Sequence, residues 1–345
     1  MLIRLLLLLV LSALPARAEV ATFPAMDPKA PPERMVIYST LDTRLATPLV
    51  QAFQRQRPGL TIQYEDSLAA DIAQRVMAEA DAGKATADFV FSSGMDWQMK
   101  LANDGYARPV AVPKAANWPR WANWRDTAFA LTFEPAVLVY HRPSFPDGPP
   151  LSRLGLIEWL AKTPPDSNGR IGTYDIERSS VGYLYLVRDA EHFADIWSLL
   201  RAMARVGLRT YPTSQEIIDR VADGRLALGY NILGSYAADQ ARLRPDLGLV
   251  QLSDFTVVVS RVGLVPAAAP SPDLGAAFLT FLMGAEGQAL LAEGLHLPTS
   301  GVSAQSGQKG ALRPVAVSPG LLAYLDQAKR RGVISRWRKA LGLEN

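Results

Sequence analysis

Small hydroxyl, glycine and charged residues follow several strand-like apolar runs of this 345-residue chain and lead directly into helix-like runs. In an open α/β sheet, ligands gather beyond the carboxyl ends of parallel strands. Helix N-termini at that edge offer unpaired N–H groups and partial positive charge, which suit an anion. The pattern occurs in two separate regions, which predicts one small polar ligand held between two α/β lobes. The candidate contacts are Ser39, Thr40, Ser92, Ser93, Gly94, Thr173, Arg178, Ser179, Ser180, Tyr230 and Asn231.

The triplet Arg178-Ser179-Ser180 carries the most suggestive chemistry among these candidates. A guanidinium group binds a carboxylate or phosphate through two parallel hydrogen bonds, and the neighbouring hydroxyl and amide groups would complete the site. Asp175 and Glu177 are close enough in sequence to pair with Arg178 at the surface instead. Both interpretations stay open at the level of sequence.

Several other candidates have an ordinary structural alternative. Ser39 and Thr40 are residue types that favour helix N-caps. Tyr230 and Asn231 offer a rigid ring, a hydroxyl group and an amide that both donates and accepts hydrogen bonds. Tyr236, six residues after Tyr230, is expected on the far side of a helix.

Catalytic motifs do not compete with this binding interpretation. The sequence contains no G-x-S-x-G, H-E-x-x-H or G-x-x-x-x-G-K-[ST] motif. Glu134, Asp175 and Glu177 are possible acid–base carboxylates, but sequence does not pair them in space. We therefore expect a binding protein without cofactor or resident metal rather than an enzyme, with an exported hydrolase as the alternative from another class.

The N-terminal segment predicts export. A short basic start, Met1 to Arg4, precedes an apolar run from Leu5 to Leu14 and the A-x-A sequence Ala16-Arg17-Ala18. This order is typical of a cleavable signal peptide, and the apolar run is too short for a membrane span. We expect residues 1–18 to be removed and the mature chain to begin at Glu19 in the periplasm.

Composition narrows the function further. The chain has no cysteine, which excludes disulfides, thiolate metal sites and a lipoprotein anchor on a cysteine after cleavage. Removing residues 1–18, which contain Arg4 and Arg17 and no acidic residue, leaves 34 basic and 33 acidic residues. The net charge falls from +3 to +1, which does not favour nucleic-acid binding.

Alternating strand and helix patterns predict an α/β fold with doubly wound parallel sheets. Strand patterns at residues 35–39, 60–64 and 87–91 flank helix patterns at 47–57 and 70–82. The β-rich segment from Phe129 to Tyr140 is long enough to run from one lobe into another, and a second alternation begins near Gly169. The mature chain also exceeds the size at which one core stops growing.

Several segments, in order, resemble the periplasmic substrate-binding proteins of ABC importers, in the branch that includes ferric-iron-binding proteins. They are Val36–Thr40, the strand and loop Ala87–Ser93, Arg261–Pro266 and the helix Phe278–Gln288. The resemblance implies two lobes joined by hinge strands, with lobe one at 19–135 and 255–345 and lobe two at 136–254. It also implies a monomer that closes on its solute and presents it to a membrane permease or to a membrane sensor kinase.

The iron-binding members of that branch use adjacent tyrosines with hard oxygen donors for ferric iron. The matching stretch here, Gly229 to Tyr236, has no tyrosine pair, and His141, His192 and His296 lie outside the candidate loops. We therefore expect a small anionic solute, a carboxylate, phosphate ester or phosphonate, with ferric iron as the alternative ligand.

Overall fold

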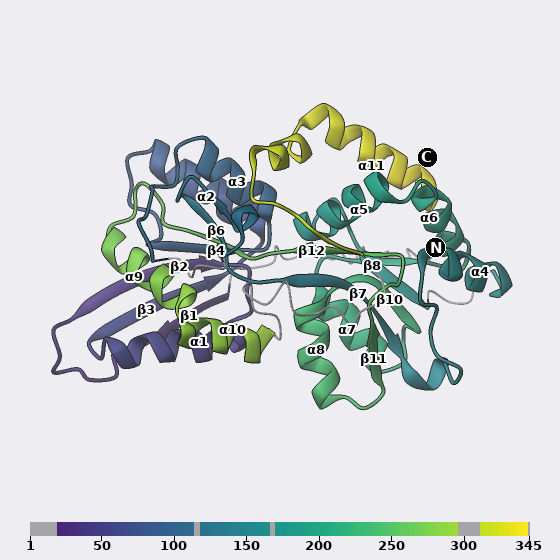
Figure 1. Cartoon of the computed structure of the whole chain (residues 1–345), viewed down its shortest axis with the longest axis horizontal. Coiled ribbons are helices and arrows are strands. Elements are labelled where there is room, and N and C mark those ends of the chain that lie inside the picture. Colours follow the sequence, from purple (N-terminus) through teal and green to yellow (C-terminus); the bar gives the residue numbers. More distant parts are fainter. Residues whose placement is uncertain (1–18, 114–117, 166–169, 296–310, 344–345) are drawn as a thin grey trace, which may run out of the picture.

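The computed structural model describes residues 19–113, 118–165, 170–295 and 311–343. The expected signal peptide, residues 1–18, lies outside the described residues. The described chain forms two sheets, each covered by helices and lying side by side in Figure 1. The predicted α/β class with two doubly wound sheets is therefore confirmed.

The first sheet has the order β1-β3-β2-β4-β13-β6-β5, with β2, β3 and β4 parallel. Its strands are β1 (Glu19–Phe23), β2 (Glu33–Ser39), β3 (Leu60–Asp66), β4 (Phe89–Ser92), β5 (Asn123–Trp124), β6 (Ala128–Ala130) and β13 (Val262–Leu264). The helices of this half are α1 (Thr43–Gln56), α2 (Ala69–Asp81), α3 (Met95–Asn103), α9 (Pro272–Met283) and α10 (Ala285–Leu295), and a short 3-10 helix spans Arg120–Ala122.

The second sheet has the order β14-β12-β7-β10-β8-β9, and β11 also pairs with β7. Its strands are β7 (Glu134–His141), β8 (Ile171–Tyr174), β9 (Arg209–Tyr211), β10 (Leu228–Leu233), β11 (Leu247–Val250), β12 (Phe255–Val259) and β14 (Ala311–Pro314). The helices of this half are α4 (Arg153–Lys162), α5 (Ser180–His192), α6 (Ile196–Arg205), α7 (Ser214–Ala222), α8 (Gly234–Leu243) and α11 (Gln327–Leu341), with a 3-10 helix at Arg142–Ser144. A further 3-10 helix, Pro319–Tyr324, packs mainly against α3 of the first half.

Two of the chain crossings between the sheets are neighbours. The chain passes from β6 in the first sheet to β7 in the second, and returns from β12 to β13. These segments are antiparallel partners on both sides, because β6 pairs with β13 and β7 pairs with β12. The predicted passage of the segment Phe129 to Tyr140 between lobes is therefore confirmed.

Only part of the chain after residue 254 lies with the first sheet, namely β13, α9 and α10. We expected 255–345 to belong to lobe one, but β12 and β14 lie in the second sheet. Helix α11 packs against α6 of the second half, and Figure 1 shows it lying along α5 and α6. The C-terminal helix thus covers the half that holds residues 136–254.

Aromatic packing and one buried carboxylate fix the core of the first half. Phe53 on α1 and Phe89 on β4 both pack against Phe278 on α9, with ring centroids 5.0 and 5.2 Å apart. The Asp88 carboxylate accepts hydrogen bonds from the backbone N–H groups of Val36, at 2.8 Å, and Ser271, at 2.6 Å. These contacts hold the parallel strands in register, so that their carboxyl ends form one edge.

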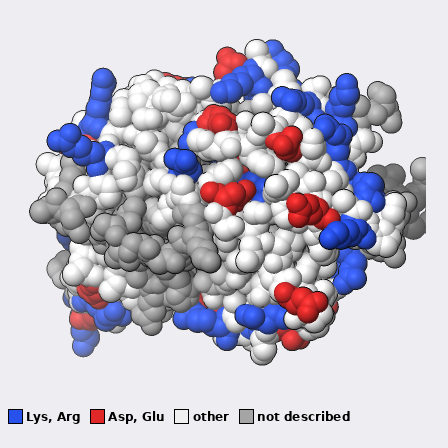
Figure 2. Space-filling model, turned by 45° about the vertical axis from the view of Figure 1, so that its right-hand side comes forward, with Lys and Arg blue, Asp and Glu red and all other residues white. Residues whose placement is uncertain are grey.

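No single helix in the described ranges is long and apolar enough to cross a membrane, and α9 with α10 reaches that length only as a pair bent by 70°. Lys and Arg side chains are interspersed with Asp and Glu on the face shown in Figure 2.

Candidate ligand-binding site

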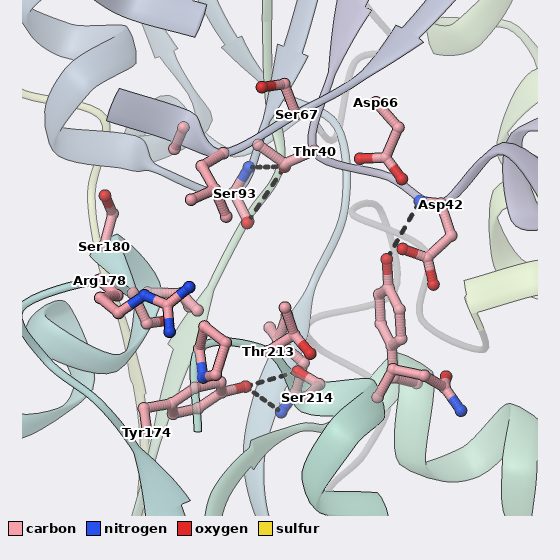
Figure 3. A pocket seen from close by; sticks show the side chains of 18 of the residues that line it. Thr40, Asp42, Asp66, Ser67, Ser93, Tyr174, Arg178, Ser180, Thr213 and Ser214 are labelled. Carbon is pink, nitrogen blue, oxygen red and sulfur yellow. Dashed lines mark hydrogen bonds between the residues drawn. The ribbon is translucent and has the colours of Figure 1, made fainter. Parts of the chain in front are cut away.

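A pocket with a volume of about 380 Å³ lies between the carboxyl ends of parallel strands from both sheets. This volume suits a small solute. Loops after β2, β3 and β4 form one wall, and loops after β8, β9 and β10 form the other (Figure 3). The lining residues are Glu19, Thr40, Asp42, Asp66, Ser67, Leu68, Ala69, Ser93, Tyr174, Arg178, Ser179, Ser180, Val181, Pro212, Thr213, Ser214, Gln215, Leu233, Tyr236 and Arg261.

Five helices begin at this pocket. Their N-cap residues, which all line it, are Asp42 of α1, Leu68 of α2, Ser179 of α5, Thr213 of α7 and Leu233 of α8. The side chains of Ser179 and Thr213 accept hydrogen bonds within their own helices, while the N-termini of α1, α2 and α8 have no side-chain cap. The N–H groups and aligned peptide dipoles at these helix N-termini favour an anionic group beside them.

Thr40 and Ser93 form the polar floor on the side of the first sheet. The Thr40 Oγ1 atom accepts a hydrogen bond of 3.0 Å from the Ser93 backbone N–H, and the two hydroxyl oxygens are 3.3 Å apart (Figure 3). The same Oγ1 atom accepts a hydrogen bond of 3.0 Å from Nη1 of Arg261. Arg261 is 0% exposed, and its Nη2 atom has no hydrogen-bond partner among the described residues.

Arg178 lies on the opposite wall, exposed to solvent and close to Ser180 (Figure 3). The surface pairing that competes with ligand binding is not formed. Glu177 pairs with Arg338 at 2.7 Å, and the Asp175 carboxylate accepts a hydrogen bond from the Glu177 backbone N–H. Within the described ranges Arg178 has no ion-pair partner, so its guanidinium group is available to a ligand.

Two carboxyl groups distinguish the other side of the pocket. Figure 3 shows Asp42 and Asp66 together on the side away from Arg178. Burial, and then the negative charge of Asp42, raise the pKa of Asp66 to about 7. Burial also raises the pKa of Asp42, against the opposing effect of Arg261. Glu19, paired with Asp66 in the β1–β3 ladder, completes an acidic end.

Two tyrosines complete the wall on the side of the second sheet. The hydroxyl groups of Tyr174 and Ser214 are 2.5 Å apart. The Tyr236 hydroxyl group accepts a hydrogen bond of 3.2 Å from the Asp42 backbone N–H and thus links the two halves. The expectation that Tyr236 lies on the far side of a helix was therefore wrong.

Five of the predicted contacts line the pocket, namely Thr40, Ser93, Arg178, Ser179 and Ser180. Three others, Ser39, Ser92 and Gly94, lie behind the first wall. The Ser39 hydroxyl group donates to the Phe91 carbonyl, and the Ser92 hydroxyl group accepts from the Gly94 N–H. A Cβ atom on Gly94 would lie 2.4 Å from that of Ala69, so this glycine permits a close approach of two loops.

The remaining three, Thr173, Tyr230 and Asn231, face the interior of the second half rather than this pocket. The Tyr230 hydroxyl group and the Asn231 amide donate to the buried Asp189 carboxylate at 2.6 and 2.7 Å. Thr173 donates to the Tyr230 carbonyl. Their predicted contact with ligand stays a prediction, but their hydrogen bonds serve the fold.

Sequence reasoning missed the acidic residues, the Thr213–Ser214 loop, Tyr236 and Arg261. The same signal, a polar residue directly after a strand, was present at Asp66-Ser67 and at Pro212-Thr213-Ser214. Among the described residues, no three His, Cys, Asp or Glu side chains gather as a metal site.

Residues 48–311 match the family of bacterial extracellular solute-binding proteins. The substrate-binding protein of an ABC transporter from Agrobacterium tumefaciens is 51% identical, with 95% of this chain and 99% of that chain covered and a TM-score of 0.88. No curated protein matches the chain.

More distant structures share the fold. The periplasmic binding protein AfuA of Actinobacillus pleuropneumoniae, solved with fructose-6-phosphate, is 14% identical with a TM-score of 0.71, over 90% of this chain and 99% of that chain. Iron-bound HitA of Pseudomonas aeruginosa is 15% identical with a TM-score of 0.66, over the same shares. The family match and the close relative decide membership: the chain belongs to the bacterial extracellular solute-binding proteins.

Proposed function

We propose that the chain captures a small anionic solute in the pocket between its two halves and delivers it to the membrane permease of an ABC importer. The observation that carries this proposal is the convergence of helix N-termini and two guanidinium groups, Arg178 and Arg261, on one pocket. The ABC-transporter protein of Agrobacterium tumefaciens supports the transport role.

The route to the periplasm belongs to the same proposal. Residues 1–18 act as a cleavable signal peptide, and the mature protein, which has no cysteine for a lipid anchor, works there as a monomer. It binds its solute without chemical turnover. A permease is the proposed membrane partner, and a sensor kinase in its place would leave the binding chemistry unchanged.

The anionic character of the solute is tested on protein purified from the periplasm without denaturation. Native mass spectrometry identifies the bound solute, and isothermal titration then measures its affinity. Arg178→Ala should weaken binding by about 10- to 100-fold, as expected for loss of a hydrogen bond to a charged group.

Arg201→Ala is the matched control, because Arg201 is an exposed cation on α6 of the same half and does not line the pocket. The Arg201→Ala variant should bind the solute with the affinity of the wild-type protein. A neutral bound solute, or equal affinities in the two variants, would contradict the role of Arg178 as counter-charge.

A further inference from the structure

The charged side chains that line the pocket do not suit a simple anion. Two guanidinium groups, of Arg178 and Arg261, face three carboxyl groups, of Glu19, Asp42 and Asp66. One of the two guanidinium groups is already balanced, because Arg261 forms a buried ion pair of 3.2 Å with Glu134. A solute with only negative charge would therefore meet repulsion at the acidic end.

The acidic end has no ion-paired cation among the described residues, although the buried charge of Arg261 acts to lower the pKa of both Asp42 and Asp66 against the larger effect of burial. Neither Asp42 nor Asp66 forms an ion pair within the described part of the chain, and Asp42 does not cap helix α1 with its side chain. Figure 3 shows both carboxyl groups on the side of the pocket opposite Arg178 and Ser180. Two carboxyl groups in partial burial, close enough to affect one another, are costly unless a positive group joins them.

An independent observation also points to a missing ligand. The side chain of Arg261 is 0% exposed, lines the same pocket and leaves Nη2 without a hydrogen-bond partner among the described residues. A buried donor of this kind is costly unless something accepts from it. Among the described residues, the pocket thus leaves one buried donor of Arg261 without an acceptor, and Asp42 and Asp66 without an ion-pair partner.

We propose that the solute is zwitterionic, with an anionic group bound by Arg178, Arg261 and the helix N-termini and an ammonium group bound by Asp42 and Asp66. This inference rests on the proposed function and adds the second charge of the solute. The cavity of about 380 Å³ fits a short amino acid or amino-alcohol phosphate.

The competing explanation is a hydroxylated anion whose hydroxyl groups donate to the same carboxylates. Pairs of probes that differ only by an amino group in place of a hydroxyl group distinguish the zwitterion from the hydroxylated anion. One pair is γ-aminobutyrate and γ-hydroxybutyrate, and the other is phosphoethanolamine and ethylene glycol monophosphate. Isothermal titration measures each affinity for the wild-type protein, Asp42→Asn, Asp66→Asn and Asp71→Asn.

The aminated member of at least one pair should bind about 10-fold or more tightly than its hydroxylated counterpart, as expected for a desolvated charge pair. That preference should disappear in Asp66→Asn and in Asp42→Asn. It should persist in Asp71→Asn, because Asp71 is an exposed acid on α2 outside the pocket lining. Circular dichroism and melting temperatures confirm that these near-isosteric variants are folded.

The proposal is overturned if no aminated probe binds more tightly than its hydroxylated counterpart, including the case in which neither binds. It is also overturned if both pocket variants keep the preference. Ethanolamine, which lacks the anionic group, separates this result from the proposed function. Binding of ethanolamine as tight as that of phosphoethanolamine would contradict anion capture itself, whereas tight binding of both members of a pair would contradict only the zwitterion.

Discussion

The guanidinium group of Arg261 lies 3.2 Å from the carboxylate of Glu134, and both side chains are 0% exposed. Glu134 begins β7 in the second sheet, and Arg261 directly precedes β13 in the first. The pair therefore joins two of the chain segments that connect the halves. Arg261 also donates a hydrogen bond to Thr40 at the floor of the pocket. The same residue therefore takes part both in the connection between the halves and in the pocket.

Glu134→Gln should destabilise the protein by about 3–5 kcal/mol, because it leaves the charge of Arg261 buried without its partner. Urea denaturation of the ligand-free protein measures this change. The double variant Glu134→Gln/Arg261→Met removes both charges and should recover part of the loss. A change below about 1 kcal/mol in Glu134→Gln would contradict this expectation and mean that hydration or rearrangement of Arg261 compensates for the lost ion pair.

Tyr230→Phe should affect stability rather than affinity. Its hydroxyl group donates to Asp189 at 2.6 Å and accepts from Nε of Arg153 at 2.9 Å, inside the second half. Loss of these bonds to charged groups should cost about 1–3 kcal/mol in urea denaturation. Solute affinity should change less than about 2-fold. A large loss of affinity with unchanged stability would restore Tyr230 as a ligand contact.

The sequence was sufficient to predict where the pocket lies, because strand ends are local features. Thr40, Ser93 and Arg178 follow strands and reach the pocket. Sequence does not tell which strand-end side chains turn inward. Asn231 has a φ of 59°, and its amide side chain binds the buried Asp189.

Long-range contacts decided the rest of the site. Arg261 reaches the pocket through pairing with Thr40 and Glu134, both more than a hundred positions earlier in the chain. Arg261 needs a counter-charge because it is buried, and the hydrophobic pattern of the sequence does not predict that burial. The acidic end similarly depends on the alignment of Asp66 with Glu19 across the β1–β3 ladder.

Ferric citrate should produce no visible tyrosinate-to-iron absorption band. Burial raises the pKa of Tyr236, the tyrosine nearest to Asp42 in the pocket, which disfavours the phenolate that ferric iron needs. Absorption spectra of the protein with and without ferric citrate check this expectation. A strong band that disappears in Tyr236→Phe would support the iron-binding alternative.

The pH dependence of Asp66 gives a prediction with a definite sign. Burial and the charge of Asp42 raise its pKa to about 7 in the folded protein, far above the value of about 4 expected in an unfolded chain. The folded state therefore holds the proton more tightly than the unfolded state. The contribution of Asp66 to the free energy of unfolding is therefore fully present at low pH and is lost as the pH rises from about 4 to 7. The charged groups that act on Asp66 are Asp42, Arg261 and Glu19.

Asp66→Asn should consequently raise the melting temperature of the ligand-free protein more at pH 8 than at pH 4.5, because only at the higher pH does the wild-type protein hold a buried charge there. Asp71→Asn, at an exposed position on the following helix α2, should show no such difference. Binding of phosphoethanolamine should have the opposite pH dependence. Its ammonium group stabilises the charged carboxylate of Asp66, so the affinity of the wild-type protein should increase as the pH rises through about 7. Differential scanning fluorimetry and titrations at both pH values make these measurements. A variant that is equally stabilised at both pH values would show that Asp66 is not ionised in the pocket and could not hold a cationic group.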